Sequence, residues 1–181
     1  RDRGRVGPAM SWGRPQVGSR RSWRGCGFDR EWFGLAGPRA EQGDLAEARR
    51  LCEQALPILR EISGGVEEAA ALVNLSSLLL QSGDLPGARL RSDAALVTAR
   101  RVASRSAEAH ALEAGGHVLL LEGQLADAQP LLLQAVVIRR EIGERITAAT
   151  AELLLARADL EQGRLAEADA AARRVASEMQ A

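Results

Sequence analysis

The same short word recurs in this chain every 40 residues. It reads EQGDLAEA from position 41, QSGDLPGA from 81, LEGQLADA from 121 and EQGRLAEA from 161. A glycine, a leucine and an alanine keep one register in all four copies: Gly43, Gly83, Gly123 and Gly163; Leu45, Leu85, Leu125 and Leu165; Ala48, Ala88, Ala128 and Ala168. A fixed period of this length is typical of stacked units that cannot bury their apolar faces alone.

The apolar spacing within each unit predicts two helices. Before the repeated glycine, Ala71, Leu72, Leu75 and Leu79 recur at helical intervals, and a similar pattern follows the glycine. The glycine permits a tight turn between the helices. The helices are expected at residues 44–62, 66–81, 84–101, 106–121, 124–142, 146–161 and 164–179.

Helix caps and small residues add detail to each unit. Asp44 is expected to cap the first helix, with Glu47 completing a capping box, whereas Gln124 and Arg164 are weaker residues at the matching position. The repeated alanine lets paired helices approach to the tight end of the ~8–10 Å range. The repeated leucine is expected to fill the junction, so that Leu85→Ala would cost about 2–5 kcal/mol.

The register is similar to that of a known family. Small residues, the Gly-Asp turn and two alanines follow each other in the second unit as Ser76, Gly83, Asp84, Leu85, Ala88 and Ala95. The other units read Gly43, Asp44, Leu45, Ala48 and Ala55; Gly116, Gly123, Leu125, Ala128 and Ala135; and Ala156, Gly163, Leu165, Ala168 and Val175. This pattern resembles the tetratricopeptide repeat in a long form of ~40 residues. The family's usual aromatic positions hold aliphatic or polar residues here.

The resemblance covers residues 41–181 and implies an all-α, right-handed α-solenoid. The repeats would span about 42–81, 82–121 and 122–161, with a half repeat at 162–181. The RREIG helix end at 139–143 resembles those of arrays appended to large bacterial signalling and transcription regulators. The last helix, with Leu165, Ala172, Val175 and Met179 on its apolar side, has no following unit. A missing continuation, self-association or marginal stability is therefore expected there.

Residues 1–40 differ in composition from the repeats. They hold nine arginines and three acids, about +6, against 15 arginines and 21 acids, about −6, in residues 41–181. All five aromatic residues lie here: Trp12, Trp23, Phe28, Trp32 and Phe33. The segment is expected to be a mostly disordered arm, with a short or irregular helix within 28–40 that covers the first apolar face. It is either a linker or a basic arm that contacts nucleic acid. The chain starts with Arg, which suggests a piece of a longer protein.

No constellation of residues supports an enzyme, a cofactor or a metal. His110 and His117 lie two turns apart on one helix, roughly 10.5 Å along its axis, which is too far for one zinc ion. The two cysteines, Cys26 and Cys52, form no disulfide framework, which favours a reducing, cytoplasmic location. No apolar run approaches the ~20 residues that cross a membrane.

The resemblance also implies a binding groove, because the first helix of each pair lines the concave surface of such solenoids. The groove positions are Ala70, Val73, Asn74, Ser77, His110, Glu113, His117, Thr150, Leu153 and Arg157. The two histidines would make contacts that change near pH 6.5. Asn74 matches the place where related clamp proteins hold a peptide carboxylate, but the clamp lysines are absent here. An amphipathic helix or an extended apolar peptide is therefore the favoured ligand.

The expected function is a protein-interaction scaffold that binds another protein or a peptide, without contact to a membrane. The alternative is a sensory or regulatory segment of a larger multidomain bacterial regulator with an ATPase, kinase or transcription-factor part. Nucleic-acid binding through the basic arm ranks third.

Overall fold

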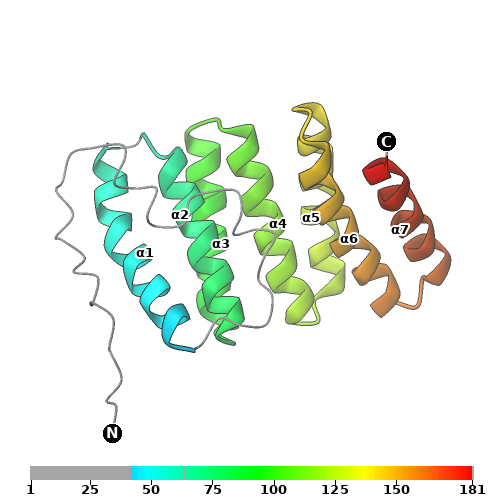
Figure 1. Ribbon diagram of the computed structural model, residues 1–181, viewed down its shortest axis with the longest axis horizontal. Helices are drawn as coiled ribbons and strands as arrows, with labels where there is room; N and C mark the ends of the chain where they lie inside the picture. The colour runs from blue at the N-terminus through cyan, green and yellow to red at the C-terminus, as the bar shows by residue number, and fades with distance from the viewer. Residues whose placement is uncertain (1–41, 63, 181) are drawn as a thin grey trace, which may run out of the picture. The chain divides into compact units, whose positions relative to one another are not determined.

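The computed structural model describes residues 42–62 and 64–180, all within the unit Ala40–Ala181 of the two units into which the chain divides. These residues form seven α-helices and no strand (Figure 1). The helices are α1 (Gln42–Ile62), α2 (Val66–Gln81), α3 (Leu85–Arg101), α4 (Arg105–Leu121), α5 (Leu125–Glu141), α6 (Arg145–Glu161) and α7 (Leu165–Gln180). The arm, the helix within 28–40 and Cys26 lie outside the described residues.

The expected helix boundaries hold to within two residues, with one informative difference. Helix α1 begins at Gln42, so Gly43 and Asp44 lie in its first turn instead of preceding it. The predicted cap at Asp44 is therefore misplaced. In the later repeats the glycine turn closes onto a preceding helix, as when the amide of Asp84 donates to the carbonyl of Leu79 (2.9 Å).

The turns between paired helices follow the predicted glycine chemistry. Gly83, Gly123 and Gly163 have φ values of +80°, +75° and +76°, in the left-handed region that favours glycine. After the first of these turns, Asp84 caps α3, since its Oδ1 accepts from the amide of Gly87 at 2.9 Å. Gln124 makes no side-chain cap, as its weaker capping chemistry predicts.

Each helix packs against the next along the chain, and the first helices of the pairs also contact one another. Helix α2 touches α4, and α4 touches α6, whereas α1, α3, α5 and α7 make no such contacts among themselves in the described part of the chain. The first helices are therefore closer together, on the inner side of a curved stack. This arrangement confirms the all-α repeat solenoid.

Small residues set the crossing of the two helices in each repeat. Where α2 crosses α3, the Ser76 hydroxyl donates to the carbonyl of Ala88 at 2.8 Å. In the third, a Cβ added to Gly116 would lie only 2.6 Å from Cγ of Leu132. The fourth places Ala156 in one buried cluster with Ala168. The close approach predicted from the small residues is confirmed.

The repeated leucine packs less fully than predicted. Leu85 and Leu125 are half-buried, and Leu165 is 66% exposed. Each is the first residue of its helix, so it lies at the end of the helix crossing, where fewer side chains surround it. Leu165 also has no following repeat to cover it among the described residues. The cost predicted for Leu85→Ala is accordingly too high.

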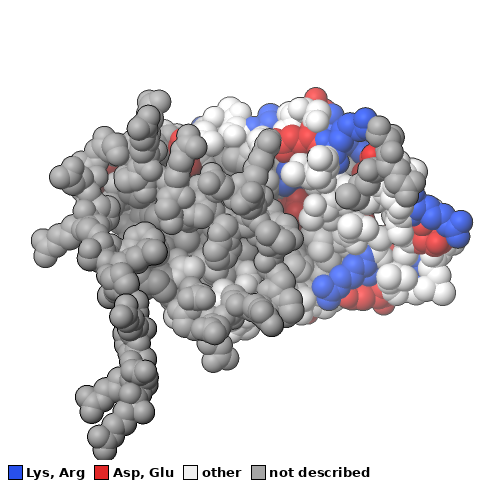
Figure 2. All heavy atoms as spheres, viewed as in Figure 1, with Lys and Arg blue, Asp and Glu red and all other residues white. Residues whose placement is uncertain are grey.

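Buried glutamates on the first helices each bind two arginines, one from each of the neighbouring second helices. Glu68 on α2 binds Arg60 of α1 (2.7 Å) and Arg101 of α3 (3.2 Å). Glu152 on α6 binds Arg140 of α5 (2.6 Å) and Arg174 of α7 (3.1 Å). Figure 2 shows the resulting mixture of acidic and basic side chains over the C-terminal helices.

Candidate partner-binding site

The ten predicted groove residues lie on α2, α4 and α6, in rows that repeat every 40 residues. One row is formed by Val73, Glu113 and Leu153. Val73 is 3% exposed, and Glu113 binds a side chain of α5. Leu153 is 49% exposed. The place of this row in a binding groove stays a prediction.

The other positions remain accessible from the inner side of the stack. Ala70, Asn74 and Ser77 on α2 are half-buried, as are His110 and His117 on α4. On α6, Thr150 and Arg157 are exposed. These seven positions lie on the three first helices α2, α4 and α6, and their role in binding a partner stays a prediction.

A polar cluster lies between α4, α5 and the start of α6. Arg139 of α5 is 1% exposed, and its Nε and Nη2 donate to one oxygen of Glu113 at 3.1 and 2.8 Å. Its Nη1 donates to Glu144 at 2.9 Å. Glu144 also accepts from the hydroxyls of Ser106 (2.8 Å) and Thr147 (3.2 Å). The cluster thus joins three helices through one buried guanidinium.

Comparison between repeats shows that this cluster is specific to the third. Arg139 occupies the register position of Leu59 and Ala99, both of which are buried. Glu113 occupies that of Val73 and Leu153. Sequence reasoning named Glu113 but missed Arg139. The available signal was an arginine within the apolar stripe of a second helix, visible only when the repeats are aligned on their 40-residue period.

Known proteins agree with this architecture. A family model of the tetratricopeptide repeat matches residues 32–101. The crystal structure of BtubC (BKLC) from P. vanneervenii superposes with a TM-score of 0.66 at 20% identity, over 76% of this chain and 57% of that one. The described residues of this chain therefore have the fold of tetratricopeptide repeats.

A second structure shows the same fold. The TPR-like repeats of a Podosopora anserina protein, described as a kinesin light chain, superpose with a TM-score of 0.61 at 20% identity, over 75% of this chain and 67% of that one. The chain thus spans only part of the length of both. No curated protein matches its sequence. Tetratricopeptide repeats generally mediate protein–protein interactions, and their fold is typically a non-catalytic scaffold.

Burial sets the electrostatics of the polar cluster. It raises the pKa of Glu113, although the charge and hydrogen bonds of Arg139 oppose the shift. Burial also acts to raise the pKa of Glu144, but bonds from Ser106 and Thr147 and the charge of Arg139 hold that pKa below its ordinary value. Burial, followed by the charge of Arg139, lowers the pKa of His110 to about 4. His110 therefore does not titrate near pH 6.5, although the ordinary pKa of a histidine predicts that it would.

The pKa of His110 makes stability depend on pH. Between pH 6.5 and about 4 the unfolded chain binds a proton at His110 that the folded chain does not, so stability falls as the pH falls through this window. We expect a loss of about 2 kcal/mol after allowing for the partial exposure of the ring. His110→Ala, which introduces the residue found at position 70, should remove this loss while His117 continues to titrate.

Urea unfolding of the parent and His110→Ala at pH 7 and pH 4.5 measures this effect. The difference in free energy of unfolding between the two proteins should shift in favour of the variant at the lower pH. An equal difference at both pH values would contradict the lowered pKa of His110.

The second histidine lies near the cation Arg157. Burial lowers the pKa of His117, and the nearby charge of Arg157 on α6 lowers it further. Arg157 forms an exposed ion pair with Glu161 one turn along the same helix, at 2.8 Å. Such exposed pairs contribute little and exchange readily, so Arg157 is able to bind an acidic group of a partner.

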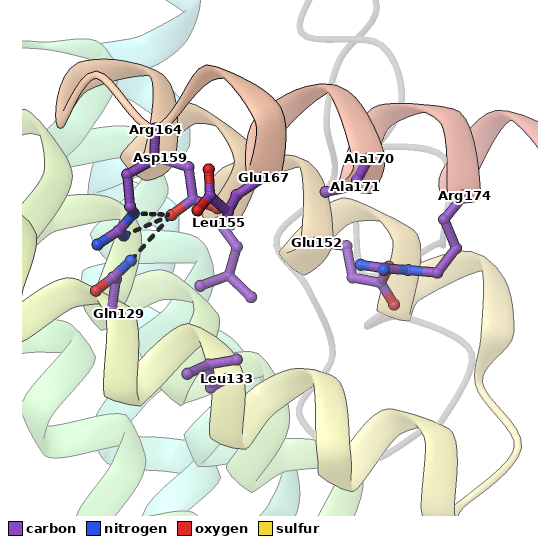
Figure 3. Close-up of a pocket in the computed structure, with 10 residues that line it drawn as sticks. All are labelled: Gln129, Leu133, Glu152, Leu155, Asp159, Arg164, Glu167, Ala170, Ala171 and Arg174. Carbon is purple, nitrogen blue, oxygen red and sulfur yellow. Dashed lines mark hydrogen bonds and ion pairs between the residues drawn. The ribbon is translucent and has the colours of Figure 1, made fainter.

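A separate hollow of about 490 Å³ lies between α5, α6 and α7 (Figure 3). Its polar groups already bind each other: Asp159 accepts from Gln129 (3.1 Å) and from Nε of Arg164 (3.0 Å), and Arg174 donates to Glu152 (3.1 Å). The remaining lining consists of the carboxylate of Glu167 and the apolar side chains of Leu133, Leu155, Ala170 and Ala171. Most of the polar groups of the hollow are therefore engaged with each other.

Residues 42–62 and 64–180 contain no group of three His, Cys, Asp or Glu side chains placed to hold a metal ion. None of the seven helices combines the length and apolar character that crossing a bilayer requires.

Proposed function

We propose that this chain is a protein-binding scaffold that holds a peptide or a partner helix along the inner side of α2, α4 and α6, and that it performs no chemistry itself. The observation that carries the proposal is the set of half-buried and exposed residues on these helices, together with the polar cluster of the third repeat. A groove built from packed helices is rigid, which reduces the entropic cost of binding.

The polar cluster supports recognition rather than stability. A buried ion pair such as Arg139–Glu113 generally stabilises a fold no better than apolar packing does. The other repeats fill the same register with Leu59, Ala99 and Val73, so apolar packing fits this architecture. A need to hold the His110 side chain in one position on the groove side accounts for the polar Arg139–Glu113 pair in this repeat.

The chemistry of the groove indicates the kind of ligand. Its α2 end is small and weakly polar, with Ala70, Asn74 and Ser77, whereas its α6 end carries the cation Arg157. An amphipathic peptide with an acidic residue toward α6 fits this gradient. Cytoplasmic location and bacterial origin belong to the same proposal, as the context in which such a scaffold would work.

Selection of peptide ligands from a displayed library against the full chain tests the proposal. The selected peptides should lose at least about tenfold in affinity for Ser77→Arg and for Thr150→Arg, because each places a bulky side chain in the groove. Val97→Arg is the matched control, since Val97 is 67% exposed on α3, a second helix. Ligands that respond only to Val97→Arg, or to none of the three changes, would show that binding occurs elsewhere.

A further inference from the structure

The hollow between α5, α6 and α7 is lined by two acids at positions that hold core leucines in the earlier repeats. Glu152 and Asp159 of α6 both line it. Their counterparts 40 and 80 residues earlier are Leu112, Leu119, Leu72 and Leu79. Each of those leucines is at most 2% exposed. Because the fold accepts leucine at both positions in two repeats, it does not require the two acids here.

A small residue on α7 keeps this hollow open. Ala171 lines the hollow and occupies the register position of Leu131 on α5. Leu131 packs against the two buried clusters that contain Leu112 and Leu119. Alanine lacks the atoms that would fill the same place one repeat later. The resulting volume of about 490 Å³ lies within the ~300–1,000 Å³ that is typical of ligand sites.

Two carboxylates at one end of the hollow keep oxygen atoms that are available to a ligand. The hydrogen bonds that Asp159 accepts from Gln129 and Arg164 all end on its Oδ1, so Oδ2 accepts none from the described residues. Solvent reaches Oδ2, because no fully buried side-chain oxygen of the described residues lacks a hydrogen bond. Glu167, which lies beside Asp159 in Figure 3, is exposed and forms no ion pair with the described residues.

The charges of the lining favour a cation at this end. The lining contains the carboxylates of Glu152, Asp159 and Glu167 but only two guanidinium groups, those of Arg164 and Arg174. Arg174 binds Glu152 at the other end of the hollow (Figure 3). Arg164 is therefore the one cation of the lining that lies beside both Asp159 and Glu167, and this end carries an excess negative charge.

The apolar part of the lining continues onto the surface of α5. Leu133 and Leu155 lie between the two ends of the hollow (Figure 3). Leu133 is 54% exposed, and Val137, one turn further along α5, is 53% exposed. A ligand that combines a cation with an aliphatic stem and an apolar neighbour fits this surface better than a free ion does.

We propose that the hollow binds an arginine side chain from a segment of a partner protein. The guanidinium lies between Oδ2 of Asp159 and the carboxylate of Glu167, its aliphatic stem packs on Leu133 and Leu155, and an apolar neighbour of the arginine packs on Val137. Arginine suits this place because its head group is more weakly hydrated than an ammonium and donates to two carboxylates at once.

This site is separate from the proposed groove. Glu152 and Asp159 follow the groove positions Thr150 and Arg157 by two residues each, which is about 200° around the helix. The two sets of side chains therefore lie on opposite sides of α6. Binding in the hollow does not depend on whether the groove binds a partner.

NMR titration of the full chain with a blocked tripeptide of leucine, arginine and leucine tests the proposal. The methyl signals of Leu133 and Leu155 should shift, and citrulline in place of arginine should raise the dissociation constant at least about tenfold, because citrulline keeps the shape and loses the charge. Blocked arginine alone should bind more weakly than the tripeptide. Unshifted methyl signals, equal binding of the citrulline peptide, or equal binding of blocked arginine overturns the proposal.

Two variants test the residues of the hollow. Glu167→Gln removes a charge from an exposed side chain, and Ala171→Leu fills the hollow with the residue found at position 131; each should raise the dissociation constant of the tripeptide at least about tenfold. Glu67→Gln is the matched control, since Glu67 is an exposed glutamate in the first turn of α2, as Glu167 is in that of α7. Unchanged affinity in Glu167→Gln, or an equal loss in Glu67→Gln, overturns the proposal.

A groove variant separates this proposal from the proposed function. Thr150→Arg should leave binding of the tripeptide unchanged, because position 150 lies on the opposite side of α6. Loss of tripeptide binding in Thr150→Arg would place the peptide in the groove and overturn the proposal for the hollow.

Discussion

Replacing Glu113 with leucine should destabilise the protein by about 3–5 kcal/mol, although leucine is the residue that position 153 uses in the same register. The reason is the guanidinium of Arg139, which is 1% exposed and loses the carboxylate that accepts two of its three hydrogen bonds. Glu144 would remain as its one acidic partner. Chemical denaturation followed by circular dichroism measures the loss.

The double variant Glu113→Leu with Arg139→Met provides the control. It replaces both members of the buried pair with apolar side chains, so no buried charge is left without a partner, and we expect stability within about 1 kcal/mol of the parent. Glu144 keeps its bonds to Ser106 and Thr147 and is exposed enough to be hydrated. A double variant no more stable than Glu113→Leu would mean that the cost arises from packing and not from the isolated charge.

Leu132→Ala should cost a similar amount, about 2–5 kcal/mol. Leu132 is 0% exposed and belongs to the buried cluster that joins α4, α5 and α6, with Leu119, Leu120 and Ala158. Truncation would leave a cavity that the surrounding helices cannot close. Leu85→Ala is the comparison, since Leu85 is half-buried at the start of α3 and should cost clearly less. Equal costs for the two changes would contradict this picture of the core.

The contact between Leu132 and Gly116 offers a sharper version of the same test. Gly116→Ala alone should destabilise by about 1–3 kcal/mol, because the new Cβ would lie 2.6 Å from Cγ of Leu132. In the Leu132→Ala background the space is open, and the better helix propensity of alanine should make Gly116→Ala neutral or stabilising. Additive effects of the two changes would show that these residues do not limit the approach of α4 and α5.

The 40-residue period of the sequence predicted most of the fold. Helices α2 to α7 begin and end within one residue of the positions that apolar spacing and turn glycines predicted. These signals are local, because helical periodicity, a left-handed turn residue and a small residue at a helix crossing each act within one unit. The cap at Asp44 was misplaced because α1 already begins at Gln42.

Local signals in the sequence thus specify the units: helix pairs of fixed length, joined by glycine turns and stacked because neither helix can bury its apolar face alone. Contacts between the packed helices set the surroundings of each side chain. They bring Glu113 to Arg139, lower the pKa of His110 through burial, and leave Ile146, Leu153 and Leu160 exposed. The physical reason is that these properties depend on the rotation of each repeat against the next, which no local pattern encodes.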